Sequence, residues 1–321
     1  MLSRRSLMAA TGAAGVIVAG AARAQSYPSR LVTLVVPQPP GGTPDILARL
    51  VADRLRPALG QDVIIENRPG AGGTIGAELV ARAVPDGHVL LCTTEWVFFS
   101  HLLHRKLTFD PQAFEPVGVL ASYPLILIGR SDLPFNSIAD LVQHARTHTA
   151  SLTYASSGSG SMHQLVYEGI KKLAQIDLTH VPYRGGPLAM NDLLAGRVDV
   201  SLTSLNQGVA HIRSGKLKLL GIVGRTRLAA FPDAPALSEV VPGLEADAWT
   251  GIAAPPRTPR EITGRLSDAI ARIIQSADMR ARLSETMLVP VGSTPDDMRA
   301  AMLADAQRWA PVIATAGIAL D

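Results

Sequence analysis

The hydrophobic positions of this chain switch repeatedly between short continuous runs and runs with helical spacing. Residues 31–36 are apolar at five of six positions, which is typical of a strand buried on both faces. Leu47, Val51 and Leu55 then recur four residues apart, as the apolar face of a helix does. The pattern therefore predicts a buried strand followed by a helix.

The same alternation continues over almost the whole chain. Further strands are predicted at 62–66, 88–94, in two runs within 118–130, and at 152–156, 177–181, 198–204, 217–223 and 249–254. Helices are predicted at 74–83, 137–147, 161–173, 188–195, 209–214 and from 259 onward, ending with a helix at 295–316. Strands separated by helices of about 10–15 residues are typical of parallel sheets covered on both faces. The sequence thus predicts an α/β fold.

No low-complexity linker and no internal repeat divides the chain. We therefore expect two parallel-rich α/β lobes whose connections run through strands, near 118–126 and again near 247–252. Residues 25–122 and 248–321 are expected to form one domain, and residues 123–247 the other. Two lobes joined by two crossovers enclose a cleft and can close about a hinge.

The first 24 residues have the composition of an export signal. Arg4 and Arg5 precede a short apolar run at 9–20, and an Ala-Arg-Ala tripeptide at 22–24 supplies the small residues needed for cleavage. The apolar run is shorter than the roughly 20 residues that a membrane-spanning helix needs. The sequence around the two arginines is similar to a twin-arginine signal. We therefore expect cleavage of residues 1–24 before Gln25 and a periplasmic location.

Charge and cysteine content narrow the possible functions. The full chain has a formal charge of +3, and the export segment contributes three arginines and no acid. Residues 25–321 are therefore neutral overall, and we expect no nucleic-acid partner. Cys92 is the only cysteine, which rules out an intrachain disulfide. Its apolar neighbours in the sequence predict that it is a small buried hydrophobe.

Four strand–helix junctions carry most of the candidate chemistry. Residues 37–42 hold three prolines and two glycines, and Thr43-Pro44 follows as a typical helix start. Residues 153–163 place five small hydroxyls and two glycines at a second junction, and 180–186 and 201–206 form two more. Unpaired N–H groups and serines at helix starts suit a carboxylate or phosphate. The alternative is an ordinary strand–helix turn.

Several motifs then occur in order along the chain, and together they carry a family resemblance. They are Tyr27-Pro28-Ser29-Arg30, Val35-Val36-Pro37, Pro39-Pro40-Gly41-Gly42, Asp45, Glu66-Asn67-Arg68-Pro69-Gly70-Ala71-Gly72-Gly73, Pro85-Asp86-Gly87, Tyr154-Ala155-Ser156-Ser157-Gly158, His180-Val181-Pro182-Tyr183, Asp192-Leu193-Leu194-Ala195-Gly196, Val198-Asp199, Gly215-Lys216-Leu217, Phe231-Pro232-Asp233-Ala234-Pro235 and Trp249-Thr250-Gly251. The chain thus resembles the tripartite tricarboxylate transporter receptors, also called Bug-type extracytoplasmic solute-binding proteins. The resemblance implies a type II periplasmic-binding-protein fold that closes on a small organic acid and delivers it to a membrane permease.

The resemblance also implies where the ligand binds. In the family, the Pro-Pro-Gly-Gly and Ser-Ser-Gly loops hold a ligand carboxylate, mainly through backbone N–H groups, while Asp45 is expected to brace the first loop. The glycine loop at 70–73 is a second expected wall. With polar residues of the other junctions added, the expected ligand-binding residues are Gln38, Gly41, Gly42, Thr43, Asp45, Ala71, Gly72, Thr94, Glu95, Ser156, Ser157, Gly158, Ser159, His163, Tyr183, Arg184, Ser204 and Asn206.

Some of these side chains depart from the family pattern or allow two roles. Gln38 stands where the family usually has phenylalanine, which replaces an apolar wall by an amide. Glu95 beside an anion would be unfavourable unless the ligand also carried an ammonium or several hydroxyls. The alternative for Glu95 is a solvated glutamate on the first turn of a helix. Trp96 either stacks on a flat ligand or packs internally. His163 and Arg184 either meet the ligand or have structural and solvated roles, respectively.

Enzymatic motifs are absent from the sequence. Residues 157–161 do not form the glycine–serine elbow of hydrolases, and neither a dinucleotide fingerprint nor a phosphate-binding loop occurs. The histidines show no zinc-like spacing. We therefore expect a monomeric receptor with no enzymatic activity, no cofactor and no metal. A periplasmic sensor for a signalling partner would use the same pocket and stays open as an alternative; a hydrolase is less favoured.

Overall fold

The computed structural model describes residues 27–104, 106–148 and 152–317. The expected signal peptide and its cleavage position lie outside these ranges. Within the ranges described, no helix is both long enough and apolar enough to cross a membrane.

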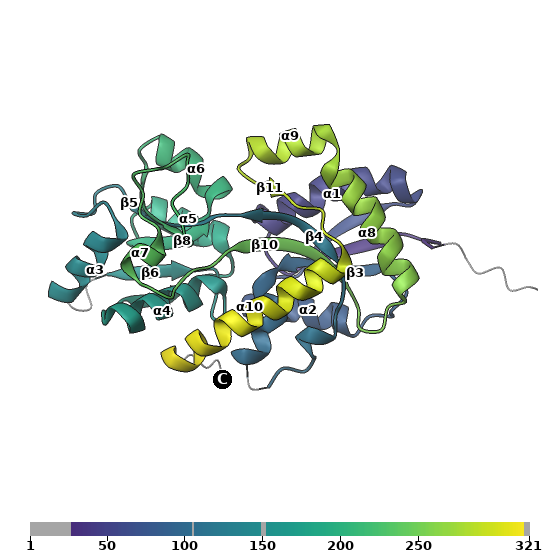
Figure 1. Ribbon diagram of the computed structural model, residues 1–321, viewed down its shortest axis with the longest axis horizontal. Coiled ribbons are helices and arrows are strands. Elements are labelled where there is room, and N and C mark those ends of the chain that lie inside the picture. The colour runs from purple at the N-terminus through teal and green to yellow at the C-terminus, as the bar shows by residue number, and fades with distance from the viewer. Residues whose placement is uncertain (1–26, 105, 149–151, 318–321) are drawn as a thin grey trace, which may run out of the picture.

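Two β-sheets form the two lobes of the molecule (Figure 1). The first sheet has six strands in the order β11-β4-β10-β3-β1-β2, and the second has five in the order β7-β6-β8-β5-β9. The first-sheet strands are β1 (Val32–Val36), β2 (Val63–Asn67), β3 (Val89–Thr94), β4 (Glu115–Tyr123), β10 (Ala248–Ala254) and β11 (Val289–Pro290). The second-sheet strands are β5 (Leu125–Arg130), β6 (Thr153–Ser156), β7 (Thr179–Pro182), β8 (Val200–Ser204) and β9 (Leu217–Val223). The predicted two-lobed α/β architecture is confirmed.

Helices cover both sheets. The first lobe carries α1 (Thr43–Leu59), α2 (Thr74–Ala81), α8 (Arg260–Gln275), α9 (Ala277–Glu285) and α10 (Pro295–Ala316), with 3₁₀ helices η1 (Ala71–Gly73), η2 (Glu95–Leu102) and η3 (Pro111–Ala113). The second lobe carries α3 (Ile138–Thr147), α4 (Met162–Ala174), α5 (Gly186–Leu194), α6 (Leu205–Arg213) and α7 (Leu237–Val240). Figure 1 shows that α10 runs across the molecule toward the second lobe, where it contacts α4.

The strand directions differ in part from the predicted parallel pattern. β1 is parallel to β2 and β3, and β6 is parallel to β7 and β8. In contrast, β10 is antiparallel to β3 and β4, β11 is antiparallel to β4, and β5 is antiparallel to β8 and β9. A strand that brings the chain back must run opposite to the strand that carried it away. Connectivity through two crossovers therefore produces mixed sheets.

The two connections between the lobes lie side by side. Pro124 alone separates β4 from β5, and because proline lacks an N–H it ends one strand before the next begins. β10 returns along β4, with Trp249 opposite Ser122. The expected crossovers at 118–126 and 247–252 fall on these strands, whereas the domain boundaries themselves stay a prediction.

The η2 segment is the main element that sequence periodicity missed. Its residues Trp96, Phe98 and Phe99 are all buried, so its apolar residues are consecutive and show no helical spacing. Phe98 stacks on Trp249 with ring centroids 5.7 Å apart, and Phe99 stacks on Trp309 at 6.4 Å. These contacts fix η2 between β10 and α10 and hold its first residue at the boundary between the lobes. A smaller difference is α6, which begins at Leu205 rather than at the predicted 209.

Candidate functional site

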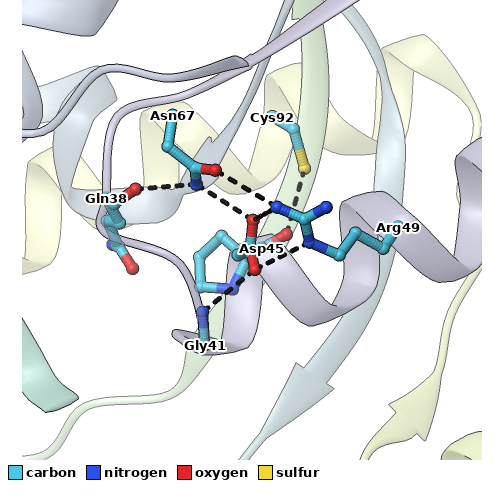
Figure 2. A network of polar contacts seen from close by, with 7 residues as sticks. Gln38, Gly41, Asp45, Arg49, Asn67 and Cys92 are labelled. Atoms are coloured by element: carbon cyan, nitrogen blue, oxygen red, sulfur yellow. Dashed lines mark hydrogen bonds and ion pairs between the residues drawn. The ribbon is translucent and has the colours of Figure 1, made fainter. Parts of the chain in front are cut away.

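A network around Asp45 fixes the proline–glycine loop that precedes α1 (Figure 2). The Asp45 carboxylate accepts hydrogen bonds from the Gly41 N–H at 3.0 Å, from Arg49 Nε at 3.0 Å and from Asn67 Nδ2 at 2.9 Å. Asn67 Nδ2 also donates to the Gln38 carbonyl at 3.0 Å. Burial favours a higher pKa for Asp45, but the hydrogen bonds from Arg49, Gly41 and Asn67 outweigh it and hold the pKa below its usual value. Asp45 therefore braces the loop as an ionised carboxylate.

The start of α1, which this network holds in place, faces the second lobe and lines the pocket between the lobes. Gly42 is the N-cap of α1 and no side chain caps the helix, so its N-terminus favours negative charge nearby. Next to the helix start, Cys92 Sγ lies 3.8 Å from the Pro44 carbonyl (Figure 2). Cys92 is buried, which confirms the prediction for this residue.

Two adjoining pockets lie between the lobes. The inner pocket encloses about 550 Å³ of empty space, including solvent at its mouth, and is lined by Gln38, Gly42, Thr43, Pro44, Thr94, Glu95, Trp96, Tyr123, Leu125, Ser157, Met162, His163, Gly186, Pro187, Ser204, Gln207 and Ala248. The outer pocket measures about 790 Å³ in the same way and is lined by Pro37, Gln38, Pro39, Pro69, Gly70, Ala71, Gly72, Gly73, Trp96, Ser157, Gly158, Ser159, Pro182, Tyr183, Arg184 and Gly185. Gln38, Trp96 and Ser157 line both pockets.

Direct hydrogen bonds join the two lobes at the inner pocket. The hydroxyls of Thr43 on α1 and Ser204 at the end of β8 lie 2.8 Å apart and share a hydrogen bond. Gln207 Nε2 on α6 donates to the Gly41 carbonyl at 3.0 Å. The lobes are thus closed around the pocket in this structure.

Two glycines allow the lobes to approach closely at the outer pocket. A Cβ at Gly72 would lie 3.0 Å from the Ser159 carbonyl oxygen, and one at Gly185 would lie 2.3 Å from Pro39 Cγ. Both glycines also have a positive φ, of +59° and +124°, which side chains other than hydrogen disfavour. Larger residues at these positions would hold the lobes apart.

Glu95 contributes a buried acid to the inner pocket. It begins η2, is 2% exposed, and accepts a hydrogen bond from the Trp249 N–H at 3.1 Å. Burial, and secondly the nearby Asp305 carboxylate, raise the pKa of Glu95 to about 8. The alternative of a solvated glutamate is therefore wrong, because the aromatic packing of η2 draws this residue inside.

Two further polar atoms, both from residues that line the inner pocket, are buried and have no hydrogen-bond partner among the described residues. They are Thr94 Oγ1 from the first lobe and His163 Nδ1 from the second. Burial lowers the pKa of His163 to about 4, so its imidazole is neutral at physiological pH and has hydrogen-bonding capacity but no charge. Unpaired buried polar groups are costly unless a bound molecule satisfies them.

The structure brings most of the predicted site residues together, but in two pockets rather than one. Those that line the inner pocket are Gln38, Gly42, Thr43, Thr94, Glu95, Ser157, His163 and Ser204. Those that line only the outer pocket are Ala71, Gly72, Gly158, Ser159, Tyr183 and Arg184. Trp96 stands between the two pockets while being 4% exposed, so it has both the packing role and the pocket-facing role that the sequence left open.

Four predicted residues line neither pocket in this structure, so that their contact with a ligand stays a prediction. Gly41 and Asp45 bond to each other in the brace. Ser156 is fully buried, and its Oγ bonds to His180 Nε2 at 2.7 Å. Asn206 Oδ1 accepts a hydrogen bond from the Thr43 hydroxyl at 3.3 Å. Each of these groups is thus engaged within the protein and positions a residue that does line a pocket.

Several lining residues were missed by the sequence analysis. They are Pro44, Tyr123, Leu125, Met162, Gly186, Pro187, Gln207 and Ala248 in the inner pocket, and Pro37, Pro39, Pro69, Pro182 and Gly185 in the outer one. Gly70 and Gly73, which also line the outer pocket, belong to the glycine loop that was expected as a wall. Tyr123, Leu125 and Ala248 belong to the crossover strands. The sequence did contain an indication for these three residues, because they lie in the predicted crossovers at 118–126 and 247–252, and such crossovers pass behind the cleft. Within the described ranges, no group of histidine, cysteine and acidic residues has the arrangement of a metal site.

Comparisons with known proteins agree on one family. The sequence model of the "Tripartite tricarboxylate transporter family receptor" matches residues 47–318. The chain is 31% identical to Protein BugT of Bordetella pertussis over 94% of both chains. Among solved structures, "R. palustris Rpa4515 with adipate" has a TM-score of 0.86 at 36% identity, covering 91% of this chain and 99% of the other. MatC of Rhodopseudomonas palustris with bound malate has a TM-score of 0.84 at 33% identity, covering 89% and 100%.

The family match at residues 47–318 extends over both lobes. The family match covers more than half of the chain, and the relatives are more than 30% identical along nearly their whole lengths. The protein therefore belongs to the tripartite tricarboxylate transporter receptor family.

Proposed function

We propose that this protein is a periplasmic receptor that captures a small organic acid between its two lobes and delivers it to a membrane permease of the tripartite tricarboxylate type. The observation that carries the proposal is the pair of unpaired buried atoms, Thr94 Oγ1 and His163 Nδ1, which belong to residues that line one pocket from opposite lobes. A ligand that pairs both atoms stabilises the closed form, since only that form presents them together. The adipate and malate bound by Rpa4515 and MatC support a carboxylate as this ligand.

The start of α1 is the proposed binding place for a carboxylate in the inner pocket. Gly42 and Thr43 present an uncapped helix N-terminus there, and the neighbouring Ser157 and Ser204 add hydroxyl donors. In the outer pocket, Arg184 supplies a positive charge beside the glycine loops. These groups replace the water shell of an anion when the lobes close.

A receptor accounts for the site better than a hydrolase does. Ser156 and His180 are hydrogen-bonded at 2.7 Å, as a nucleophile and its base would be. However, Ser156 has no exposed surface, and neither residue lines the inner or the outer pocket. The pair instead supports the Ser157–Ser159 loop, since the Gly158 N–H donates to Ser156 Oγ at 3.2 Å. We therefore propose a monomeric, non-enzymatic receptor that needs no cofactor and is exported after removal of residues 1–24.

A thermal-shift screen tests this proposal. The full chain would be expressed with its export segment, and the protein would be purified from the periplasm, unfolded and refolded to remove any retained ligand. Mono-, di- and tricarboxylates and acidic amino acids would then be added. A ligand at about 100 times its dissociation constant stabilises the folded state by about 2.7 kcal/mol, which raises the melting temperature by several degrees. A shift with at least one acid supports the proposal, and a folded protein that responds to none contradicts it.

A further inference from the structure

The inner pocket contains a buried acid without a cationic partner. Glu95 is the one acidic residue among its described lining residues, which include neither lysine nor arginine. Glu95 is 2% exposed and accepts a hydrogen bond from the Trp249 N–H. A carboxylate held in this way is costly unless an opposite charge joins it.

No neighbouring arginine supplies that charge from behind the pocket. Arg308 on α10 lies 3.7 Å from the carboxylates of Asp247 and Asp305, so its charge is already shared between two acids. Asp305 itself accepts a hydrogen bond from Trp249 Nε1 at 2.8 Å. The surroundings of Glu95 therefore add negative rather than positive potential.

The groups around Glu95 suit a small cation. The unpaired Thr94 Oγ1 adjoins it in the sequence and in the pocket, and it can accept a hydrogen bond. Trp96 and Tyr123 line the same pocket, and aromatic side chains can attract an ammonium group. A primary ammonium has three donors and no acceptor. It could therefore donate hydrogen bonds to the Glu95 carboxylate and the Thr94 hydroxyl and contact the two aromatic residues.

We infer that the inner pocket binds the ammonium group of an amino-bearing organic acid, with the Glu95 carboxylate as its counter-ion and Thr94 as a second acceptor. This inference rests on the proposed function and narrows its ligand class. The carboxylate of the same ligand lies toward the α1 N-terminus and the outer pocket. An acid without an amine would place a second polar end against Glu95 with no opposite charge.

Binding of an ammonium group beside Glu95 changes the number of protons that the protein holds. Two acids raise the pKa of Glu95, Asp305 on α10 and Asp247 just before β10, and Arg308 is paired to both of them. Tyr123 on β4 is the other titratable group close by, and the Glu95 carboxylate favours its neutral form. Burial and these acids favour a proton on Glu95 in the empty pocket, with a pKa of about 8. An ammonium requires the ionised form, so binding at about pH 7 releases a proton.

Matched pairs of acids test the inference by titration calorimetry. Each pair contains an acid with and without an amino group: aspartate and succinate, glutamate and glutarate, 2-aminoadipate and adipate, 4-aminobutyrate and butyrate. We expect the amino member of at least one pair to bind wild-type protein at least about tenfold more tightly than its partner. Repetition in buffers of different ionisation enthalpy should show proton release for that ligand.

Three variants locate the effect. Glu95→Gln should lower the affinity for the amino acid at least about tenfold and abolish proton release, while affinity for the amine-free partner stays equal or rises. Thr94→Val should weaken the same ligand about fivefold, because it removes the second acceptor. Thr93→Val is the matched control: Thr93 Oγ1 is also buried and unpaired among the described residues, but Thr93 does not line the inner pocket, so binding should not change.

The outcomes separate this inference from the proposed function. Tighter binding of the amine-free members, or equal binding by wild type and Glu95→Gln, overturns the inference and leaves the receptor standing. Binding of an amino acid with proton uptake also overturns it. No binding by any member of the pairs, together with a response to another acid in the thermal-shift screen, overturns the inference and leaves the receptor standing. No response of the folded protein in either experiment contradicts both. If Glu95→Gln fails to fold, two other results test the inference: proton release on binding to wild type, and weaker binding of the amino-bearing ligand by Thr94→Val.

Discussion

Two acidic residues at helix starts, Asp45 and Glu95, are equally buried at 2% exposure but have opposite surroundings. Asp45 accepts hydrogen bonds from a backbone amide, an amide side chain and the Arg49 guanidinium. Glu95 accepts one from a backbone amide and lies near a second acid. The pKa of Asp45 accordingly falls below its ordinary value, while the pKa of Glu95 rises to about 8.

The difference separates structure from function in this molecule. A buried carboxylate whose partners are all supplied by the chain fixes a loop, and the loop before α1 is fixed in this way. A buried carboxylate that faces a pocket without an opposite charge is retained at a cost in stability, and such groups occur mainly at functional sites. The two acids thus make opposite predictions for stability and pH.

The largest effect is expected for Glu95→Gln in alkaline solution. The folded state keeps the proton of Glu95 up to a pKa of about 8, against an ordinary value of 4.5. Wild-type stability therefore falls as pH rises between these values, and the variant, which cannot ionise, does not share this loss. Since one pKa unit corresponds to about 1.4 kcal/mol, the free energy of unfolding of the variant should rise relative to that of wild type by up to about 5 kcal/mol across this pH range. Melting temperatures from about pH 4 to 9, without ligand, measure the gap.

Glu285→Gln is the control for this series, since it removes an exposed carboxyl and should follow wild type. A gap between Glu95→Gln and wild type that stays constant with pH would mean that Glu95 is ionised throughout. Glu95 would then resemble Asp45, and the contrast between the two acids would disappear.

The second effect is the loss of the brace in Asp45→Ala. Removing the carboxylate leaves the Gly41 N–H and Asn67 Nδ2 without their acceptor and should cost about 2–3 kcal/mol in denaturant unfolding. Because the folded pKa of Asp45 is lowered, its contribution is present above the ordinary value of 3.8 and is lost as pH falls through the folded pKa. Asp53→Ala, at an exposed site on the same helix, should change little. Equal losses for the two variants would contradict a bracing role.

The third prediction concerns the coupling of Glu95 to Asp305. Asp305→Asn removes a negative charge near Glu95 but keeps an oxygen that can accept from Trp249 Nε1. The pKa of Glu95 should fall by about one unit. The stability difference between the proteins with and without Glu95→Gln should then stop growing at a pH lower by the same amount. The measurement compares the melting temperatures of the Asp305→Asn single variant and the Asp305→Asn, Glu95→Gln double variant over the same pH range. Asp296→Asn, exposed at the start of the same helix, should leave that pH unchanged, and an equal result for both aspartates would contradict the coupling.

Much of the fold follows from local patterns in the sequence. The strand and helix at 31–59 are predictable because a continuous apolar run, a proline–glycine turn and helical spacing follow one another. The bracing role of Asp45 follows as well, since its partners Gly41 and Arg49 are close in sequence. The Tyr123 and Ala248 positions in the pocket depend instead on how the crossovers pass behind the cleft, and that is set by pairing between strands far apart in the chain.

The state of Glu95 could not be predicted for the same physical reason. Its burial comes from stacking of Phe98 on Trp249 and of Phe99 on Trp309, and its raised pKa comes partly from Asp305. These partners are brought to η2 by β10 and α10, more than 150 residues later in the sequence. A glutamate next to a strand end carries no local sign of such contacts, so the sequence left the solvated alternative open.

The smallest expected effect, in Asn67→Ala, tests whether Asp45 can be moved toward the state of Glu95. Asn67 Nδ2 donates to both Asp45 Oδ1 and the Gln38 carbonyl, so its loss should cost about 1 kcal/mol in denaturant unfolding. Asp45 keeps Arg49 and Gly41, and its pKa should rise only slightly. The acid-induced loss of stability should therefore begin at a somewhat higher pH than in wild type, while the exposed Asn136→Ala control should change neither quantity. A loss as large as that of Asp45→Ala would mean that Asn67, rather than the arginine, is what keeps this buried carboxylate structural.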